Sequence, residues 1–413
     1  MGMRQQKCRG CGASLPAPFL DLGEMPLANS YVNPATAERA DRAFPLATAF
    51  CSKCYLVQLT YDVPPPELFS EYLYFSSYSE TLLAHARSMA EELSRQFKLS
   101  DQDFVMEIAS NDGYLLQYFK QFGTRVLGVE PARNIAAEAI RRGIPTVCDF
   151  FGEIAANNII LENGLADVIV GNNVLAHVPD INAFLAGVRQ CLKPGGAAIF
   201  EFPYLRSLID KIEFDTIYHE HVFYYSLNAI INLTRRAKLE LWDVSFQPVH
   251  GGSLRIFVQH QGTRSVEPGV SEMLREEERS GLLEARGYSS FGNRVMALRE
   301  ELLAMLKALR RQGKRVAAYG APAKGNTLLN YCGISAELIE FTVDRSPHKQ
   351  GLLLPGSRIP IGAPERLLEE MPDYVLVLPW NLAEEIVAQQ QTYVERGGKF
   401  LLPIPEPHIL SIN

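Results

Sequence analysis

Residues 104–131 read FVMEIASNDGYLLQYFKQFGTRVLGVEP and predict a strand, a tight turn, a helix and a second strand. The apolar run that opens the stretch is short enough for a buried parallel strand. Asn111-Asp112-Gly113 is a strong turn signal. Glu130 closes the second strand, where an acidic side chain of an open α/β sheet can bind both hydroxyls of a ribose. We therefore expect a nucleoside-binding cleft at this turn.

The turn carries one glycine and an aspartate, so it differs from the G-x-G-x-x-G fingerprint that places amides against a pyrophosphate. Asp112 would repel a phosphate, but it can hold an ammonium group. Three further strands are expected at 144–148, 166–171 and 197–202. Ligands of open α/β sheets bind beyond the carboxyl ends of the strands. Polar or aromatic residues that follow these strands should therefore line the same cleft, and they are Asp149, Phe150, Asn172 and His177.

The composition limits the class of protein. A chain of 413 residues with 47% hydrophobic residues is expected to form two or three domains with a sizeable core. Its net charge of -7 argues against general nucleic-acid binding. The N-terminus lacks the apolar segment of a signal peptide, and no apolar run is long enough to span a membrane. We expect a cytoplasmic enzyme that acts as a monomer.

Four of the seven cysteines form two C-x-x-C pairs. The pairs are Cys8 with Cys11 and Cys51 with Cys54. Each pair directs two thiolates at one ion, and two pairs complete a four-sulfur zinc shell. The alternative is a set of unlinked buried thiols. Because protein ligands would fill the coordination sphere, we expect a structural rather than a catalytic zinc.

A run of three prolines at 64–66 marks a boundary, and the hydroxyl-rich stretch YLYFSSYS follows it at 72–79. Tyr74 and Tyr78 either pack between modules or line a polar ligand pocket. Residues 81–97 predict a helix that leads into the first strand.

The stretch FDTIYHEHVFYYS at 214–226 concentrates tyrosine, histidine and glutamate. His219 and His221 flank Glu220, but the zincin spacing H-E-x-x-H is absent, so a metal site is the weaker hypothesis. Proton transfer is the better one, because histidine titrates near neutral pH and Tyr218 or Glu220 can fix its tautomer. The alternative for either histidine alone is a structural residue.

Two late strands, 239–246 and 253–259, are joined by glycines and predict an antiparallel pair. Arg255, in the stretch HGGSLR, is a candidate for binding a phosphate, although the stretch also fits a plain hairpin turn. Residues 266–312 are charged and predict a helical bridge.

The last part of the chain repeats the strand-turn-helix pattern with YGAPAKGN at 319–326. Two glycines, a lysine and a helix N-terminus suit a diphosphate, although the Walker spacing is absent. Basic and polar candidates for that ligand are Lys324, Asn326, Arg345 and Lys349. The alternative is a structural Rossmann-like domain without a ligand.

The α/β pattern that starts at residue 104 and the order of the parts resemble those of the nucleotide-deoxysugar C-methyltransferases. That family joins a zinc domain, a class I methyltransferase domain and a Rossmann-like C-terminal domain. The resemblance rests on the two Cys pairs and on EIASNDG at 107–113, YHEH at 218–221, HGGSLR at 250–255 and YGAPAKGN at 319–326. Within EIASNDG, Ala109 departs from the first motif of the class I S-adenosylmethionine-dependent methyltransferases, which usually has glycine there.

The resemblance implies an α/β enzyme with S-adenosylmethionine and structural zinc. Its substrate would be a TDP-linked 4-keto deoxysugar of antibiotic or polysaccharide biosynthesis. His221 would remove a proton from the sugar at C3, the commoner site in this family, with C5 as the alternative that the sequence leaves open. Tyr218 and Glu220 would orient the base or stabilise the enolate. Tyr74 and Tyr78 would close the sugar pocket. The cofactor would contact Glu107, Ala109, Asn111, Asp112, Gly113, Glu130, Asp149, Phe150, Asn172 and His177.

We expect a zinc domain at 1–70, a methyltransferase domain at 71–265, a helical bridge at 266–312 and a sugar-nucleotide domain at 313–413. The sequence leaves open which of the two histidines is the base, which sugar is used and what the stereochemical outcome is. Two other functions compete: an NAD-dependent sugar-nucleotide oxidoreductase and a catalytically silent binding protein.

Overall fold

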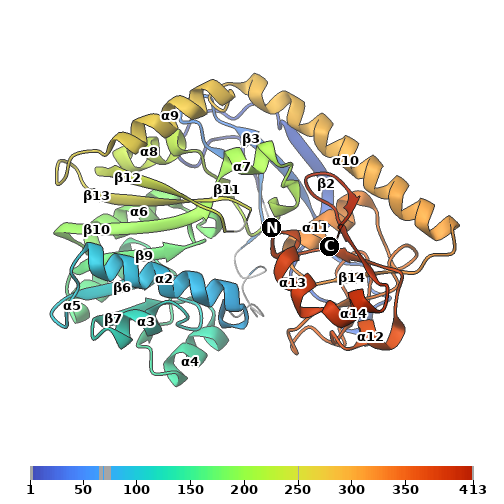
Figure 1. Cartoon of the computed structure of the whole chain (residues 1–413). Coiled ribbons are helices and arrows are strands. Elements are labelled where there is room, and N and C mark those ends of the chain that lie inside the picture. Colours follow the sequence, from blue (N-terminus) through green and yellow to red (C-terminus); the bar gives the residue numbers. More distant parts are fainter. Residues whose placement is uncertain (1–2, 65–67, 69–75, 250, 412–413) are drawn as a thin grey trace.

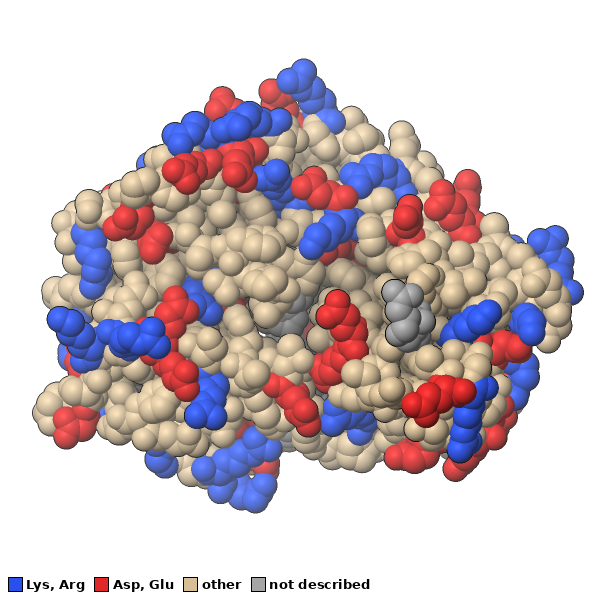
Figure 2. All heavy atoms as spheres, viewed as in Figure 1, with Lys and Arg blue, Asp and Glu red and all other residues tan. Residues whose placement is uncertain are grey.

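The computed structural model describes residues 3–64, 68, 76–249 and 251–411. These residues form two α/β lobes (Figure 1), and the helices α9 (Pro268–Ser280) and α10 (Ala285–Arg311) together run over the top from one lobe to the other. N-terminal strands lie between the lobes beneath these helices. The space-filling view shows a surface hollowed between the two lobes (Figure 2).

The larger lobe is built on a seven-stranded sheet in the order β12-β13-β10-β9-β6-β7-β8. Strands β10 to β8 are parallel, whereas β13 runs antiparallel between β10 and β12. The direction of winding reverses between β6 and β9, so the loops after these two strands form the ligand crevice of a doubly wound sheet. The strands are β6 (Phe104–Ile108), β7 (Arg125–Val129), β8 (Thr146–Val147), β9 (Ala166–Asn172), β10 (Leu192–Pro203), β12 (Leu239–Gln247) and β13 (Ser253–His260).

Helices cover both faces of this sheet, which explains why β6 is buried along its whole length. Short polar side chains set the start of two of these helices. Ser79 accepts the N–H of Leu82 at 3.2 Å at the start of α2, and Asp180 accepts two amides at 3.0 Å at the start of α6. The helices of this lobe are α2 (Glu80–Gln96), α3 (Leu116–Gln121), α4 (Arg133–Arg141), α5 (Glu153–Asn163), α6 (Ile181–Cys191), α7 (Leu205–Asp210) and α8 (Leu227–Arg236), with 3-10 turns η2 (Ser76–Tyr78), η3 (Leu175–His177) and η4 (Phe214–Thr216).

The N-terminal part forms a four-stranded sheet in the order β11-β4-β3-β2, and β1 (Met3–Arg4) pairs with β5 (Tyr61–Asp62). Strand β11 (Phe223–Tyr224) comes from the larger lobe and pairs antiparallel with β4 (Val57–Leu59). The stretch that follows Tyr218–His221 is therefore an edge strand of the N-terminal sheet. The other elements are β2 (Leu20–Pro26), β3 (Ala43–Phe50) and η1 (Pro34–Thr36).

The second lobe has a six-stranded sheet in the order β16-β15-β14-β17-β18-β19, parallel except for its last strand. Its winding reverses between β14 and β17, so the loops after these two strands meet at a second crevice. The strands are β14 (Val316–Tyr319), β15 (Thr342–Val343), β16 (Ile361–Gly362), β17 (Tyr374–Val377), β18 (Lys399–Leu402) and β19 (His408–Ile409), and the helices are α11 (Ala323–Cys332), α12 (Arg366–Glu370), α13 (Ala383–Gln389) and α14 (Gln391–Glu395), with η5 (Trp380–Leu382).

Two helices connect the lobes, as the charged stretch predicted. Helix α9 (Pro268–Ser280) starts on a proline and ends at Gly281, which has the left-handed φ of +80°. Helix α10 buries one apolar stripe, and its Tyr288 stacks on Phe50 with ring centroids 4.6 Å apart. The bridge is thus packed onto the N-terminal sheet and is not an isolated linker.

Two sequence expectations about strands need correction. The third strand of the larger sheet spans only Thr146–Val147. The strand expected at 197–202 begins earlier, since β10 starts at Leu192. Gly195 has a φ of +83°, and the pairing with β9 is interrupted between Leu192 and Ala197. Among the described residues, no helix is long and apolar enough to cross a membrane.

Candidate active site

The four N-terminal cysteines lie together. Their sulfur atoms all fall within 4.8 Å of one another, with 3.4 Å between Cys8 and Cys54 and 3.6 Å between Cys11 and Cys51. A tetrahedral zinc with bonds of about 2.3 Å requires sulfurs about 3.8 Å apart. The two knuckles share one backbone pattern, since Gly12 N–H and Tyr55 N–H each donate to the first cysteine carbonyl at 2.7 Å. The thiols therefore fit one zinc ion.

The turn after β6 has a strained backbone. Ala109, Asn111 and Gly113 have φ values of +57°, +48° and +80°, the left-handed region that is costly for residues with a Cβ. The turn also packs tightly on β7. A Cβ on Gly128 would lie 2.3 Å from Ser110 Oγ, so only glycine allows this approach. Strain of this kind is typical of ligand-binding turns.

Glu130 fixes the same turn from the end of β7. Its carboxylate accepts the N–H of Asn111 at 3.0 Å and that of Ala132 at 2.9 Å. Burial raises its pKa, whereas these two amide hydrogen bonds lower it. The carboxylate thus links the turn to the start of α4 at the position where the sequence predicted a ribose contact.

Glu107 and Asp112 are both fully buried below this turn. Burial, then Asp112 and Glu130, raise the pKa of Glu107 well above its ordinary value. No hydrogen bond of ordinary geometry reaches either carboxylate oxygen of Glu107 from the described residues. Three acidic groups around one turn suit a ligand with hydroxyls and a positive charge, and S-adenosylmethionine has both.

Asp112 has partners that the sequence did not indicate. Arg142 Nη1 lies 3.0 Å from its carboxylate, and the Ser77 hydroxyl donates to the same oxygen. The preceding amide, Ser76 N–H, donates to Asn111 Oδ1 at 2.9 Å. The hydroxyl-rich stretch therefore folds onto the cofactor turn. Of its two tyrosines, Tyr78 lies in η2 with 45% exposure, and Tyr74 lies outside the described residues.

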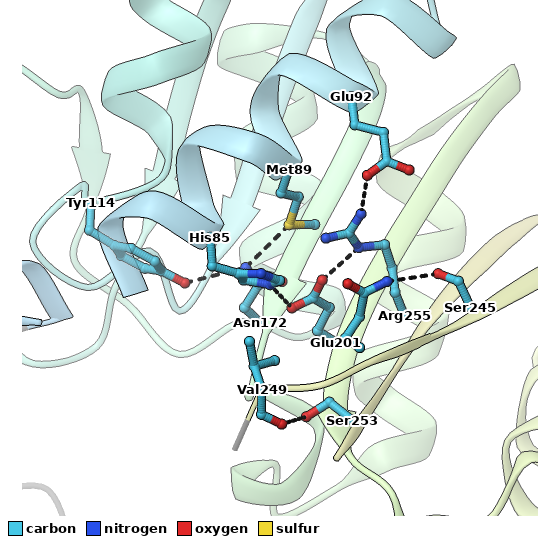
Figure 3. A network of polar contacts seen from close by, with 11 residues as sticks. His85, Met89, Glu92, Tyr114, Asn172, Glu201, Ser245, Val249, Ser253 and Arg255 are labelled. Atoms are coloured by element: carbon cyan, nitrogen blue, oxygen red, sulfur yellow. Dashed lines mark hydrogen bonds and ion pairs between the residues drawn. The ribbon is translucent and has the colours of Figure 1, made fainter. Parts of the chain in front are cut away.

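The other cofactor candidates follow β8 and β9. Asp149 is exposed, and Phe150 is 52% exposed. Asn172 ends β9, and its Nδ2 lies 3.4 Å from both the Tyr114 hydroxyl and Met89 Sδ (Figure 3). His177 lies farther along the same loop, where burial lowers its pKa to about 4.

The geometry distinguishes the two histidines of the Tyr218–His221 stretch. His221 Nδ1 lies 2.9 Å from the carbonyl oxygen of Thr216, which can only accept, so Nδ1 carries the proton. Nε2 is left as an acceptor and lies 2.7 Å from the Tyr218 hydroxyl. The ring of His177 meets that of His221 edge-on at 4.7 Å. His221 is therefore held in the tautomer of a general base.

His219 has a different environment. It is 3% exposed, its Nε2 donates to the carbonyl of Phe44 at 3.2 Å, and burial lowers its pKa to about 4. Glu220 is also 3% exposed and accepts from Asn29 Nδ2 at 2.6 Å. Burial raises the pKa of Glu220 to about 7. His219 thus anchors the stretch to the N-terminal sheet.

Lys324 lies at the crevice of the second lobe and bonds Asn381 Oδ1, with its ammonium 4.2 Å above the Trp380 ring. Burial lowers its pKa, and Asp215 and Glu213 raise it. Trp380 Nε1 donates to Asp215 Oδ2 at 2.8 Å. Residues at the second crevice therefore contact Asp215, in the segment that precedes Tyr218–His221.

The remaining basic candidates lie on the second lobe in different settings. Asn326 is buried and donates to Ala28 O at 2.6 Å. Lys349 donates to Ala321 O at 2.9 Å. Arg345 is partly exposed, 3.8 Å from Glu385.

Arg255 lies on the predicted strand, but its environment differs from that of a phosphate ligand. It is 2% exposed on β13, and its guanidinium bonds Glu201 at 2.5 Å and Glu92 at 2.6 Å (Figure 3). His85 Nε2 lies 2.7 Å from the other oxygen of Glu201. Because two carboxylates neutralise this arginine inside the larger lobe, the geometry does not support a diphosphate contact.

Several residues around the site gave no recognisable signal in the sequence. Asn29, Ser77, Arg142, Asp215 and Trp380 reach it from separate segments. Asp215 alone has a sequence signal, because it lies in the polar stretch that contains Tyr218–His221. The others depend on contacts across the fold.

The fold and the site define a class I methyltransferase with an added zinc module and a second α/β lobe. Three family models match in order: "Putative zinc binding domain" at residues 8–69, "Methyltransferase domain" at 82–244 and "C-methyltransferase C-terminal domain" at 248–405. The chain is 38% identical to C-methyltransferase NovU of Streptomyces niveus over 98% of this chain and 97% of that protein. The protein belongs to this C-methyltransferase family.

Solved structures match part of the chain. An S-adenosylmethionine-dependent methyltransferase from Clostridium acetobutylicum shows 15% identity and a TM-score of 0.35, over 43% of this chain and 91% of that one. Magnesium protoporphyrin IX methyltransferase of Synechocystis shows 11% identity and a TM-score of 0.33, over 44% and 82%.

The protein is thus an S-adenosylmethionine-dependent C-methyltransferase with a zinc-binding domain. The acidic turn of the larger lobe fits the cofactor, and the cysteine cluster fits the metal. The residue limits of our four domains stay predictions, as do the roles of the individual site residues.

Proposed function

We propose that the enzyme methylates the carbon next to the keto group of a TDP-linked 4-keto deoxysugar, with His221 as the base. The fixed tautomer of His221 is the observation that supports this most strongly. S-adenosylmethionine, when bound, supplies an electrophilic methyl group. The protein must supply a carbanion, and a carbon beside a keto group yields one because the enolate oxygen shares its charge.

His221 and Tyr218 divide the proton chemistry between them. Nε2 of His221 is the acceptor of the ring and takes the sugar proton, while Thr216 O stabilises the imidazolium that forms through Nδ1–H. The Tyr218 hydroxyl lies beside Nε2 and is placed to donate to the enolate oxygen. Glu220 and Tyr78 complete the proposed sugar pocket.

The cofactor turn supplies the second half of the site. Glu107, Asp112 and Glu130 hold the positive charges and ribose hydroxyls of the cofactor, and Asn172 and His177 border the cleft. Asp149 and Phe150 are proposed to hold the adenine. Together with Ala109, Asn111 and Gly113, these residues fix the methyl group in line with the sugar carbon.

The crevice of the second lobe is proposed to hold the diphosphate. Lys324 is the best-placed cation there, because it lies at the switch point of the sheet. Asn326, Arg345 and Lys349 lie on the same lobe. We leave Arg255 out of this set because Glu92 and Glu201 already neutralise it.

The experiment follows the label of [methyl-¹³C]S-adenosylmethionine into a TDP-4-keto deoxysugar, with NMR to locate the new carbon bond. A label at C3 is the expected result, and a label at C5 would move the reaction to the other side of the ketone. An unlabelled sugar with zinc-loaded, folded enzyme would contradict the proposal. We also propose that the enzyme works in the cytoplasm as a monomer, which cell fractionation and gel filtration check.

A further inference from the structure

A loop of the zinc domain, residues 27–32, reaches the second lobe. Tyr31 Oη donates to Ala321 O at 2.6 Å, and Asn326 Nδ2 donates to Ala28 O at 2.6 Å. On the second lobe, the acceptor Ala321 lies in the turn after β14, and the donor Asn326 lies in α11, the helix that follows this turn. The loop is therefore fixed from both sides by hydrogen bonds to a different domain.

Asn29 lies in the middle of this fixed loop and points at the catalytic stretch. Its Nδ2 donates to Glu220 Oε1 at 2.6 Å across 191 residues of sequence. Because a carboxylate oxygen can only accept, the amide is oriented with its nitrogen toward Glu220. The zinc domain thus delivers one hydrogen-bond donor to the residue next to His221.

Glu220 needs such a donor because of where it lies. It is 3% exposed, and a buried carboxylate without partners is costly. Its other oxygen, Oε2, is buried and has no hydrogen-bond partner among the described residues. Asn29 therefore satisfies one carboxylate oxygen of Glu220, and a group from outside the described residues would be needed to satisfy the second.

The charge balance supports the same conclusion. Burial raises the pKa of Glu220 to about 7, whereas the Asn29 hydrogen bond lowers it. Without the amide, the carboxyl group would hold its proton more strongly and would rotate more freely. Both changes would alter what Oε2 presents to a substrate.

We propose that Asn29 is a positioning residue for the methyl-transfer reaction: it holds Oε1 of Glu220 so that Oε2 faces a hydroxyl of the sugar substrate. This inference rests on the proposed function, because Glu220 matters here only as a substrate contact. It gives the zinc domain a part in the reaction beyond its own stability. Asn29 acts through Glu220 and has no direct step in the chemistry.

A double-mutant cycle tests the proposal by steady-state methyl transfer to the TDP-4-keto sugar. Asn29→Ala should lower kcat about tenfold with a smaller change in KM, and Glu220→Gln should lower it at least as much. If Asn29 acts through Glu220, the double variant should match Glu220→Gln within about twofold. Independent effects that multiply would overturn the proposal.

Two further variants keep the result interpretable. Asn29→Asp preserves the size of the side chain but removes the donor, so it should lose activity as Asn29→Ala does. It keeps the test valid if the smaller alanine of Asn29→Ala disturbs folding. Asn33→Ala is the matched control, because Asn33 lies near the same loop and its side chain caps the amide of Ala35. Its kcat should equal that of the wild type.

The outcomes separate this inference from the proposed function. A wild-type enzyme that transfers no methyl group to the sugar would remove both. An active wild type with an equally active Asn29→Asp variant would remove the role of Asn29 alone. S-adenosylhomocysteine affinity and the melting temperature, measured on each variant, establish that the cofactor cleft is intact.

Discussion

The hydroxyl oxygen of Tyr218 lies 2.7 Å from Nε2 of His221, and the two rings overlap with centroids 4.0 Å apart. On the far side of the imidazole, Nδ1 is 2.9 Å from the carbonyl oxygen of Thr216. One ring nitrogen is thus bound to the backbone, and the other meets a group able to give a proton. This arrangement gives His221 the tautomer that a general base requires, with a proton donor beside it.

Replacement of the base should remove turnover and leave cofactor binding unchanged. We expect His221→Asn to lower kcat by about 10²–10⁴, the usual contribution of a positioned general base. S-adenosylhomocysteine affinity, measured by calorimetry, should stay within about twofold. His221→Asn should also stop deuterium exchange into the ketosugar in D₂O with S-adenosylhomocysteine bound. Continued exchange would place the base elsewhere.

Loss of the Glu130 carboxylate should weaken cofactor binding. Glu130→Ala leaves the amides of Asn111 and Ala132 without their acceptor and removes the proposed ribose contact. We expect a 10- to 100-fold rise in the dissociation constant for S-adenosylmethionine, on the order of 1.4–3 kcal/mol. Glu162→Gln, a change at an exposed glutamate on α5, is the control. Equal affinities for the wild type and Glu130→Ala would remove Glu130 from the cofactor site.

Zinc removal should affect catalysis through β4. This strand begins three residues after Cys54, and its partner β11 begins two residues after His221. We expect Cys54→Ser to lose the zinc ion, to melt at a lower temperature and to lose most of kcat. Metal analysis and calorimetry measure the first two effects. Full activity of a zinc-free enzyme would separate the module from the active site.

The two lobes should loosen when the Trp380–Asp215 hydrogen bond is removed. Trp380→Phe deletes the donor of a partly buried hydrogen bond to a carboxylate, which is worth about 1.5–3 kcal/mol. We expect lower thermal stability and a higher KM for the sugar nucleotide. Trp242→Phe is a matched control, since the Trp242 indole N–H has no hydrogen-bond partner in the described structure. Equal losses of stability would rule out a special role for the contact.

Glu220 should make stability fall as pH rises. Its pKa is raised by burial to about 7 from 4.5, so the folded protein holds a proton between these values that the unfolded chain has lost. The unfolding free energy contributed by this group is therefore fully present below pH 4.5 and is lost as pH rises through 7. Glu220→Gln should remove this slope, which melting curves from pH 5 to 8 measure. Parallel curves for the two proteins would contradict the shift.

The local features of the fold follow from the sequence because they depend on near neighbours. The strand-turn-helix at 104–131, the helical stretch at 266–312 and the antiparallel pair of β12 and β13 were all predicted and are confirmed. Cys spacing likewise predicted the zinc cluster. Periodicity, turn residues and ligand spacing report on contacts within a few residues, and tertiary packing did not override them here.

Other features were decided only by the tertiary structure. The sequence did not distinguish His219 from His221, because what differs is the partner: Phe44 for one, Tyr218 for the other. The sequence suggested Arg255 as a phosphate ligand, but in the fold Glu92 and Glu201 form ion pairs with it. Such contacts join residues far apart in the chain, and no local pattern encodes which of them meet. The sequence therefore determined the modules and their chemistry, and packing between the modules decided which side chains are available to react.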